Sequence, residues 1–508
     1  MRLSDRAVYQ VNVFGEQQLN KPASRVRVKV MKWCLLFFFS YAFQAIAAPG
    51  SYVVVSSQST ADDPGWAKVI ARLAARHNAR ERVVFPDGQP SAALAQLRAA
   101  HPRYTCFVAR HDEVTREFVC QIHQMTRMLD GDPYADTLWG ILTGYDASNA
   151  ESIASTQNPL VIERVASGTE VALEQCREGI WYCELQKGRM VRKKPGGSPV
   201  ETTVPADTTG ALAATLTQYK AQLFVTSGHA TERGWQIGFK YRNGFFKCAD
   251  GGLFGVDTKG RRIDIHSPNP KVYMPIGNCL MGHIDGQDAM ALAWLKSAGV
   301  RQMLGYTVPT WYGYAGWGCL DYFVEQPGRY SFSEAYFANQ HALIHRLETC
   351  FPEIARMALD DPNDAGKMRP KIKGTPAAKV AGLNAQDGVG LLFDRDAVVF
   401  YGDPAWDARL AAGNCAYTQQ LQQEEGKYTL LIKPSWGNRS FKPVNTNGSQ
   451  RGGRPIVAYF PQRLKDIRIV EGSALNPVIT DDFILVPNPG EGNKARQYKV
   501  VFTARPAA

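Results

Sequence analysis

Short apolar runs alternate with amphipathic helical segments near the start of the chain. Residues 52–55 form a β-branched run, and Asp63-Pro64 is a pair typical of a helix cap and first helical position. The same order recurs, with strands expected at 83–85 and 104–108, each followed by apolar residues at helical spacing. Because alternating strands and helices cover both faces of a parallel sheet, this pattern predicts an α/β fold.

A second alternating block follows a Pro-, Gly- and Thr-rich stretch at 188–209, which we interpret as a linker. Strands are expected at 223–226 and 273–276, and a helix is expected at 289–298, ending at Gly299. Further along, the sequence predicts a strand around Met303, a helix from a capping box of Ser331 and Glu334 to about Leu347, and a strand at 398–401. This block is predicted to be a second α/β unit.

The chain changes character from about Asn414 onward. Short alternating apolar runs, such as 428–432 and 483–486, are separated by Gly, Pro and Asn, and helical periodicity disappears. Short strands with regular turn signals predict a small β-sandwich. The expected domains are an N-terminal α/β subdomain at 48–165, a second α/β subdomain at 166–412 and a C-terminal β-sandwich at 413–508.

Residues 31–47 have the pattern of a signal peptide. A short positive start precedes an apolar run at 33–39, and a small-residue cleavage site ends at Ala47. The apolar run is well short of the roughly 20 residues that a membrane-spanning helix needs. We therefore expect export to the periplasm, the cell surface or the medium, with no stable membrane insertion after cleavage. Residues 1–30 are interpreted as an upstream extension before the true start at Met31.

The net charge is concentrated at the start of the chain. Residues 1–47 hold seven Lys/Arg and two Asp/Glu, so the total of +11 falls to about +6 without them. No basic run interleaved with aromatic residues occurs, so binding of nucleic acid is not expected. The longest basic cluster, 189–194, lies in the predicted linker; we interpret it as a solvated loop, with a processing site as the alternative.

The cysteine count is odd once the predicted signal peptide is removed. Ten cysteines include Cys34, and nine remain. In an oxidising compartment that number fits up to four disulfides and one free thiol, whose pairing the sequence does not define. None of the spacings matches a paired CxxC zinc site, so a structural metal is not expected.

Two reactive residue types follow predicted strands of the second block. The run 223–229 ends in His229, and the run 273–279 ends in Cys279. The carboxyl ends of parallel strands lie at one edge of a sheet, so the two side chains are expected to meet there. A cysteine beside a histidine loses its proton more readily, and the thiolate is the species that attacks a carbonyl carbon.

Further motifs accompany this order of a histidine followed about fifty residues later by a cysteine. They are Trp235, Cys279-Leu280-Met281-Gly282, Leu304-Gly305-Tyr306, Phe400-Tyr401-Gly402-Asp403-Pro404 and the loop from Asp130 to Asp136. Together they resemble the gingipain-type cysteine peptidases of the caspase-like clan, over roughly residues 50–410.

The resemblance implies a caspase-like three-layer α/β sandwich with mainly parallel sheets in two subdomains, followed by an immunoglobulin-like β-sandwich. It implies a cysteine endopeptidase that acts on protein or peptide substrates and needs no cofactor or metal. Cys279 would be the nucleophile and His229 its proton acceptor, with the backbone N–H groups of Cys279 and Ala230 as the oxyanion hole. The family usually has glycine at the position of Ala230, so a catalytically inactive homologue that binds peptides or proteins is the alternative.

Three residues near the pair are candidates for shaping the site. Gly228 precedes His229, and His283 and Asp285 follow Cys279 closely, where they could orient the histidine. The alternative is a polar loop that caps the next helix, since aspartate favours a helix start.

His341 and His345 are four residues apart on a predicted helix, which is how zinc peptidases present two ligands. A zincin has glutamate directly after its first histidine, whereas this chain has Ala342. A packed helix face is therefore the favoured interpretation, and a metal hydrolase is a third alternative.

Overall fold

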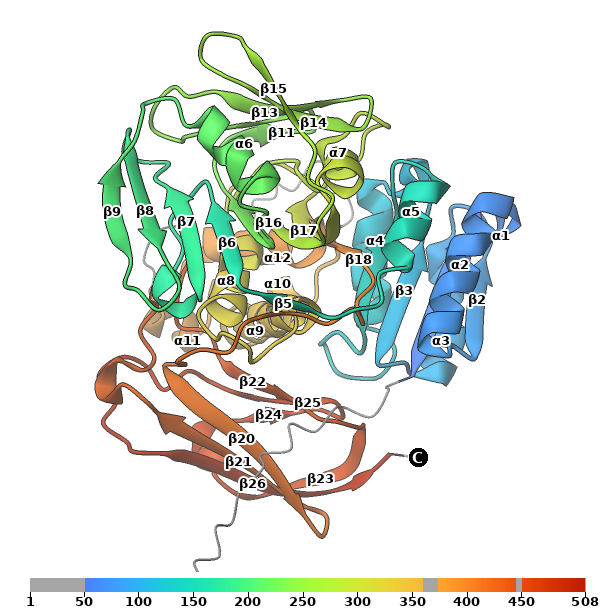
Figure 1. The fold of residues 1–508 in the computed structure, drawn as a ribbon. Coiled ribbons are helices and arrows are strands. Elements are labelled where there is room, and N and C mark those ends of the chain that lie inside the picture. Colours follow the sequence, from blue (N-terminus) through green and yellow to red (C-terminus); the bar gives the residue numbers. More distant parts are fainter. Residues whose placement is uncertain (1–50, 360–372, 445–449, 508) are drawn as a thin grey trace, which may run out of the picture. The chain divides into compact units, whose positions relative to one another are not determined.

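A twelve-stranded sheet runs through both predicted α/β subdomains (Figure 1). The computed structural model describes residues 51–359, 373–444 and 450–507, so the predicted extension and signal peptide lie outside the described residues. The strand order is β2-β1-β3-β4-β18-β17-β16-β10-β6-β7-β8-β9. Neighbours are parallel except at the β17/β18, β7/β8 and β8/β9 pairs, which confirms the prediction of a mainly parallel α/β sheet.

The twelve strands are β1 (Tyr52–Ser57), β2 (Glu81–Phe85), β3 (Tyr104–Val108), β4 (Leu138–Leu142), β6 (Arg164–Ser167), β7 (Glu178–Tyr182), β8 (Arg189–Lys193), β9 (Val200–Thr203), β10 (Leu223–Thr226), β16 (Lys271–Pro275), β17 (Val300–Tyr306) and β18 (Val398–Gly402). The helices are α1 (Gln58–Asp62), α2 (Pro64–His77), α3 (Leu94–Ala100), α4 (Arg116–Thr126), α5 (Ala147–Ala154), α6 (Thr209–Thr217), α7 (Met290–Ser297), α8 (Tyr314–Phe323), α9 (Phe332–Cys350), α10 (Pro352–Ala355), α11 (Pro376–Val380) and α12 (Ala385–Ala397). In the part of the chain that the structure describes, no helix combines the length and the apolar character needed to cross a membrane.

Helix ends follow the capping chemistry expected from the sequence. The Asp63 side chain accepts hydrogen bonds from the first backbone N–H groups of α2, where Pro64 needs no acceptor. At the start of α9, Ser331 and Glu334 form the predicted capping box, each side chain bonded to the other residue's N–H. These caps confirm the predicted starts of both helices.

A five-stranded antiparallel sheet, which the sequence analysis did not predict, follows His229 directly. Its strands are β11 (Ala230–Thr231), β12 (Gly234–Gln236), β13 (Phe245–Ala249), β14 (Gly252–Val256) and β15 (Arg262–Ile265). Trp294 of α7 packs between the two sheets, with its ring 3.9 Å from that of Tyr273 in β16 and 6.4 Å from that of Phe246 in β13. The hairpin after His229 is therefore packed against the main sheet through α7.

The predicted linker at 188–209 is wrong in part. Strands β8 and β9 form an antiparallel hairpin that extends the main sheet, and the basic cluster lies mostly in β8. Strand β8 is hydrogen-bonded on both sides, so the cluster is not a solvated loop. Because both backbone edges of β8 are paired, this strand is not free to bind a processing protease.

The last described residues form two further antiparallel sheets that share a buried cluster. Residues Tyr428, Leu430 and Ile432 alternate inward along one strand, at the spacing that predicted a half-buried strand. The strands are β20 (Tyr417–Glu424), β21 (Lys427–Pro434), β23 (Leu464–Glu471) and β26 (Tyr498–Pro506) in one sheet and β22 (Ile456–Tyr459), β24 (Val478–Ile479) and β25 (Phe483–Val486) in the other, while β5 (Leu160–Ile162) and β19 (Ala408–Leu410) form a separate parallel pair.

The predicted disulfides are absent from the described part of the chain. All nine cysteines there are free thiols, and seven of them are buried. Buried thiols behave as small apolar side chains, so most of these cysteines serve packing. Cys279 and Cys415 are the two that are partly exposed.

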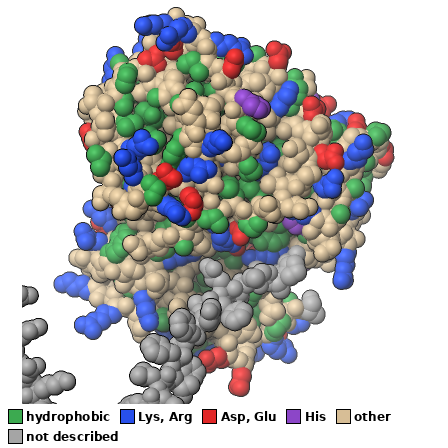
Figure 2. All heavy atoms as spheres, in the orientation of Figure 1, with side chains coloured by type: hydrophobic (Ala, Val, Ile, Leu, Met, Phe, Trp, Pro, Cys, Tyr) green, Lys and Arg blue, Asp and Glu red, His purple; other side chains and the backbone are tan. Residues whose placement is uncertain are grey.

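Charged side chains of both signs are interspersed on the face drawn in Figure 2. Lys and Arg side chains lie there among Asp, Glu and apolar groups.

Candidate active site

The loop that carries His229 leaves the carboxyl end of β10. Gly228 turns the chain at φ 89°, in the left-handed region that favours glycine. The indole N–H of buried Trp235 donates to the carbonyl of Ser227 at 2.8 Å and holds the turn in place. The His229 side chain is exposed, and its ring lies 5.0 Å from the ring of Phe239.

The loop that carries Cys279 leaves the carboxyl end of β16. The turn after Cys279 is held by two backbone hydrogen bonds, from Leu280 to Val308 and from Gly282 to Tyr306. Leu280 has φ 60°, which a non-glycine residue adopts only when its surroundings force it to. The backbone after the candidate nucleophile is therefore bent sharply.

The two loops are hydrogen-bonded to each other. Strands β10 and β16 are parallel neighbours, with Thr226 opposite Pro275. Beyond the strands, the side-chain amide of buried Asn278 donates to the carbonyl of Gly228 at 3.0 Å, and the Thr226 hydroxyl donates to its oxygen at 2.7 Å. The residues directly before Cys279 and His229 are thus in contact.

The side chains of the pair have other partners. The backbone N–H of Thr310 donates to Cys279 Sγ at 3.3 Å, and the His229 ring lies against Phe239. Within the described residues, no hydrogen bond joins Cys279 to His229. The exposed imidazole can change rotamer on a fast timescale, so its present orientation does not prevent an approach to the sulfur.

Both predicted oxyanion donors lack an acceptor in the part of the chain that the structure describes. No described acceptor lies within hydrogen-bonding distance of the Cys279 N–H. The Gln236 N–H donates to the His229 carbonyl, so by the alternation of an antiparallel ladder the Ala230 N–H points away from β12. Two N–H groups near the pair are thus available to a ligand.

His283 and Asp285 do not contact His229. His283 Nδ1 lies 2.8 Å from Glu232 Oε1, and Asp285 pairs with Arg233. Their partners stand three and four residues after His229. Each residue therefore connects the Cys279 loop to the His229 loop without touching the imidazole.

Glu184 is a buried carboxylate behind the His229 loop that the sequence analysis missed. Its oxygens accept hydrogen bonds from the hydroxyls of Thr169, at 2.7 Å, and Ser227. Glu184 follows β7, which lies two strands from β10 in the same parallel array. The rule that located His229 and Cys279 at strand ends could have found it.

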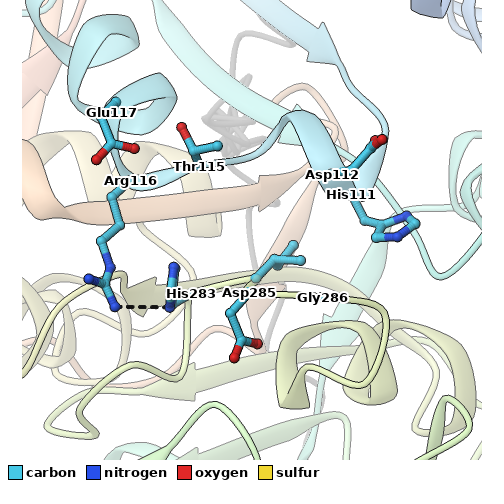
Figure 3. Close-up of a pocket in the computed structure, with 9 residues that line it drawn as sticks. His111, Asp112, Thr115, Arg116, Glu117, His283, Asp285 and Gly286 are labelled. Atoms are coloured by element: carbon cyan, nitrogen blue, oxygen red, sulfur yellow. Dashed lines mark hydrogen bonds between the residues drawn. The ribbon is translucent and has the colours of Figure 1, made fainter.

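A cleft of about 420 Å³ lies beside these loops (Figure 3). Arg116, at the start of α4, reaches across it to His283, with Nη2 3.1 Å from Nδ1. The other lining residues are His111, Asp112, Thr115, Glu117, Ile284, Asp285 and Gly286. The cleft therefore joins the first α/β block to the loop that follows Cys279.

The interpretation of His341 and His345 as a packed helix face is confirmed. The His341 ring stacks on Phe483 at 4.2 Å, and burial lowers its pKa to about 3. His345 Nδ1 lies 3.4 Å from the Tyr134 hydroxyl. Among the described residues, neither imidazole belongs to a group with the spacing of metal ligands.

A different group has the spacing of metal ligands among the described residues. His101, Asp130 and Asp136 offer atoms within 4.8 Å of one another. Burial and the neighbouring carboxylates raise the pKa of Asp136 to about 9. The loop from Asp130 to Asp136 is the one noted in the sequence for its family resemblance.

Comparison with known proteins adds little to this description. No family model matches the chain, and no curated protein matches it. A solved structure titled "Structure of Protease" is similar at a TM-score of 0.39 and 10% sequence identity, covering 90% of this chain and 98% of that one.

Proposed function

We propose that the chain is an exported cysteine endopeptidase of the gingipain type. In this proposal Cys279 is the nucleophile, His229 moves the proton, and the N–H groups of Cys279 and Ala230 bind the oxyanion. The substrates are proteins or peptides, and the residues assigned to the reaction need no cofactor. Export rests on the signal-peptide pattern at 31–47.

One observation carries the proposal. The hydrogen bond from Asn278 to the Gly228 carbonyl joins the residues that precede the two candidates, at the carboxyl edge of neighbouring parallel strands. Both side chains therefore leave the backbone from adjacent points at the edge where α/β proteins bind ligands. In this proposal the exposed His229 side chain reorients to bring the imidazole to the sulfur.

The reaction then follows from the groups at this edge. The Cys279 thiol gives its proton to the His229 imidazole, and the sulfur attacks the scissile carbonyl carbon. A C–S bond forms and the carbonyl electron pair moves to oxygen, which accepts from the two free N–H groups. When the C–N bond breaks, the His229 imidazolium gives its proton to the leaving amine. Water, deprotonated by His229, then attacks the thioester and releases the acid and the Cys279 thiolate.

The surroundings of the sulfur suit this role. The Thr310 N–H directed at Sγ stabilises negative charge on it. Phe239, beside His229, and Trp311, next to Thr310, are 45% and 39% exposed and offer apolar surface to a peptide.

Alkylation of thiols tests the proposal, because Cys279 and Cys415 are the two cysteines of the described chain that a small reagent can reach. We expect iodoacetamide to modify Cys279 first, and to do so more slowly in His229→Ala. Burial raises the pKa of Cys415, so Cys415→Ala is the matched control and should leave the fast phase intact. Cleavage of a quenched casein substrate should disappear in Cys279→Ala. Fast modification that is independent of His229, together with no cleavage, would exclude the peptidase.

A non-catalytic peptide-binding protein is the second candidate. It is favoured by the present partners of the pair, Thr310 for Cys279 and Phe239 for His229. A disulfide at Cys279 would also have favoured it, but that sulfur is a free thiol. Peptide binding that quenches the exposed Trp311 without any turnover would support this candidate.

A further inference from the structure

Three side chains from separate segments meet beside the cleft, and two of them, Arg116 and His283, line it (Figure 3). His283 Nδ1 lies 2.8 Å from Glu232 Oε1 and 3.1 Å from Arg116 Nη2, while Arg116 Nη2 is 3.6 Å from Glu232 Oε1. The three are only 15–21% exposed. We refer to Arg116, Glu232 and His283 as the loop cluster.

The loop cluster touches each segment that holds the candidate pair. Glu232 stands three residues after His229, and His283 stands four residues after Cys279. Arg116 Nε donates to the Thr307 carbonyl at 2.8 Å, three residues before the Thr310 N–H that contacts the sulfur. A displacement of any member is therefore transmitted to the sulfur or to the imidazole.

The proton on His283 Nδ1 decides which neighbour it bonds. A protonated Nδ1 donates to the Glu232 carboxylate, whereas a bare Nδ1 accepts from the Arg116 guanidinium. Arg116 and Glu232 also form a salt bridge with each other. Besides Arg116, the charged and titratable residues that line the cleft with His283 are His111, Asp112, Glu117 and Asp285, while Glu232 contacts His283 from the His229 loop.

A second ion pair joins the same two loops and provides a comparison. Arg233 pairs with Asp285, but these side chains are 47% and 36% exposed. Exposed pairs contribute little, since water and salt screen them, whereas a partly buried, hydrogen-bonded group holds its geometry. The loop cluster, and not the exposed pair, has the burial needed to position the loops.

We propose that Arg116, Glu232 and His283 are positioning residues that set the distance between Cys279 and His229. Through Arg116, the first α/β block then contributes to a reaction whose reacting groups all lie in the second. This role rests on the proposed peptidase function. The loop cluster itself touches no reacting atom.

Steady-state kinetics on a quenched casein-derived peptide test this role with the full chain. Because a misplacement of about 1 Å can cost on the order of 100-fold in rate, we expect His283→Ala to lower kcat by about 10- to 100-fold with KM changed less than about twofold. His283→Asn keeps a polar group near the Nδ1 position and should recover part of kcat. Arg233→Gln, the matched control, should stay within about twofold of wild type in both constants, as expected for an exposed pair.

A double-mutant cycle separates positioning from loss of fold. Because Glu232 and His283 belong to one network of contacts with Arg116, Glu232→Gln combined with His283→Ala should lower kcat by less than the product of the two single losses, at an unchanged melting temperature. An active wild type with undiminished kcat in His283→Ala, or with equal losses in His283→Asn and His283→Ala, overturns the positioning role alone. A wild type without Cys279-dependent cleavage overturns the peptidase, and the positioning role with it.

Discussion

The two ends of β16 differ in how completely their polar groups are satisfied. At the amino end, the buried Lys271 ammonium donates to the carbonyls of Ser267, at 2.8 Å, Asn269, at 2.7 Å, and Ala298. At the carboxyl end, Cys279 is half-buried and its N–H has no described acceptor. We call the amino end of β16 the closed end, because its buried ammonium is hydrogen-bonded. We call the carboxyl end the open end, because its Cys279 N–H has no described acceptor.

The same contrast holds along the amino edge of the sheet. Asp403 follows β18, which is antiparallel to β17, so it lies at the edge formed by the amino ends of β16 and β17. Its carboxylate accepts from the Tyr52 hydroxyl at 2.9 Å and lies 2.7 Å from His77 Nε2 and 3.4 Å from Arg76. It is 2% exposed. Fully satisfied, buried polar groups fix a structure, whereas unsatisfied groups at an accessible edge can bind something else. We therefore expect substitutions at the amino edge to lower the stability of the fold and substitutions at the carboxyl edge to lower substrate binding or cleavage.

The largest effect should come from the open end. Cys279→Ala is expected to reduce peptide cleavage by about 10⁴-fold or more, since removal of a nucleophile leaves only binding and oxyanion stabilisation. The melting temperature should change little, because the hydrogen bonds of the half-buried sulfur to described residues are weak contacts with the backbone of Thr310. Parallel assays of cleavage and thermal unfolding measure both. If Cys279→Ala had a lower melting temperature but cleaved as wild type does, Cys279 would be a structural residue and not the nucleophile.

Asp403→Asn should be the most destabilising change at the closed edge. Burial alone would raise the pKa of Asp403, but the hydrogen bond and charge of His77, with Arg76, lower it below its usual range. Breaking such a buried pair costs about 3–5 kcal/mol. Because the folded-state pKa is depressed, this stabilisation is present above the unfolded value of about 3.9 and is lost as pH falls through the folded pKa.

Urea unfolding at pH 7 and at pH 3 measures this contribution. Wild type should lose stability toward the lower pH, and Asp403→Asn should lose less over the same interval. An equal loss in both proteins would show that other carboxyl groups dominate the acid response. Cleavage per folded molecule should match wild type at pH 7, since Asp403 lies at the edge opposite to Cys279.

Much of the parallel core was predictable because its signals are local. The strands at 104–108 and 223–226 match β3 and β10 residue for residue, and the caps at Asp63 and Ser331 form as expected. Apolar periodicity and capping chemistry depend only on near neighbours in the chain. They therefore survive in a single sequence without tertiary information.

The errors arose where distant contacts decide the structure. The basic strand β8 looked like a linker because its apolar partner, β7, supplies the sheet that it joins. Free thiols replaced the expected disulfides because most cysteines lie in the buried core, where they pack as apolar groups.

The candidate site was predictable only for the residues that end a strand. His229 and Cys279 follow apolar runs, so their loops could be located. Thr310, Phe239 and Glu232 reach the site from loops and from the short sheet after His229, which have no periodic signal. The contacts of Glu232 and Phe239 depend on the hairpin of β11 and β12, and that of Thr310 depends on the loop after β17.

A smaller effect is expected for Lys271→Met. Loss of the ammonium leaves three backbone carbonyls without a donor, which costs about 1–3 kcal/mol. Burial, together with the charge of Arg301, lowers the pKa of Lys271 to about 7. The unfolded lysine, with a pKa near 10.4, then binds more protons than the folded one above pH 7, so wild-type stability should rise with pH across that interval.

Urea unfolding between pH 7 and pH 9 isolates this lysine. The rise in wild type should exceed that in Lys271→Met by up to about 1 kcal/mol per pH unit. Identical slopes in the two proteins would mean that the amine stays charged among its carbonyl partners. In either case cleavage should be unaffected, because the lysine lies at the end of β16 remote from Cys279.

The smallest effect should come from Phe239→Ala at the rim of the open end. An exposed ring beside His229 offers a substrate apolar surface, and its removal should raise KM by about threefold, or about 0.7 kcal/mol, with little change in stability. Phe245→Ala is the control, since this ring is 38% exposed but is carried on β13 beside Lys247. Equal KM values for the two variants would mean that Phe239 does not bind substrate and that binding at the open end involves only the residues around Cys279. A rise in KM for Phe239→Ala alone would extend the ligand-binding edge from the sulfur to the sheet that follows His229.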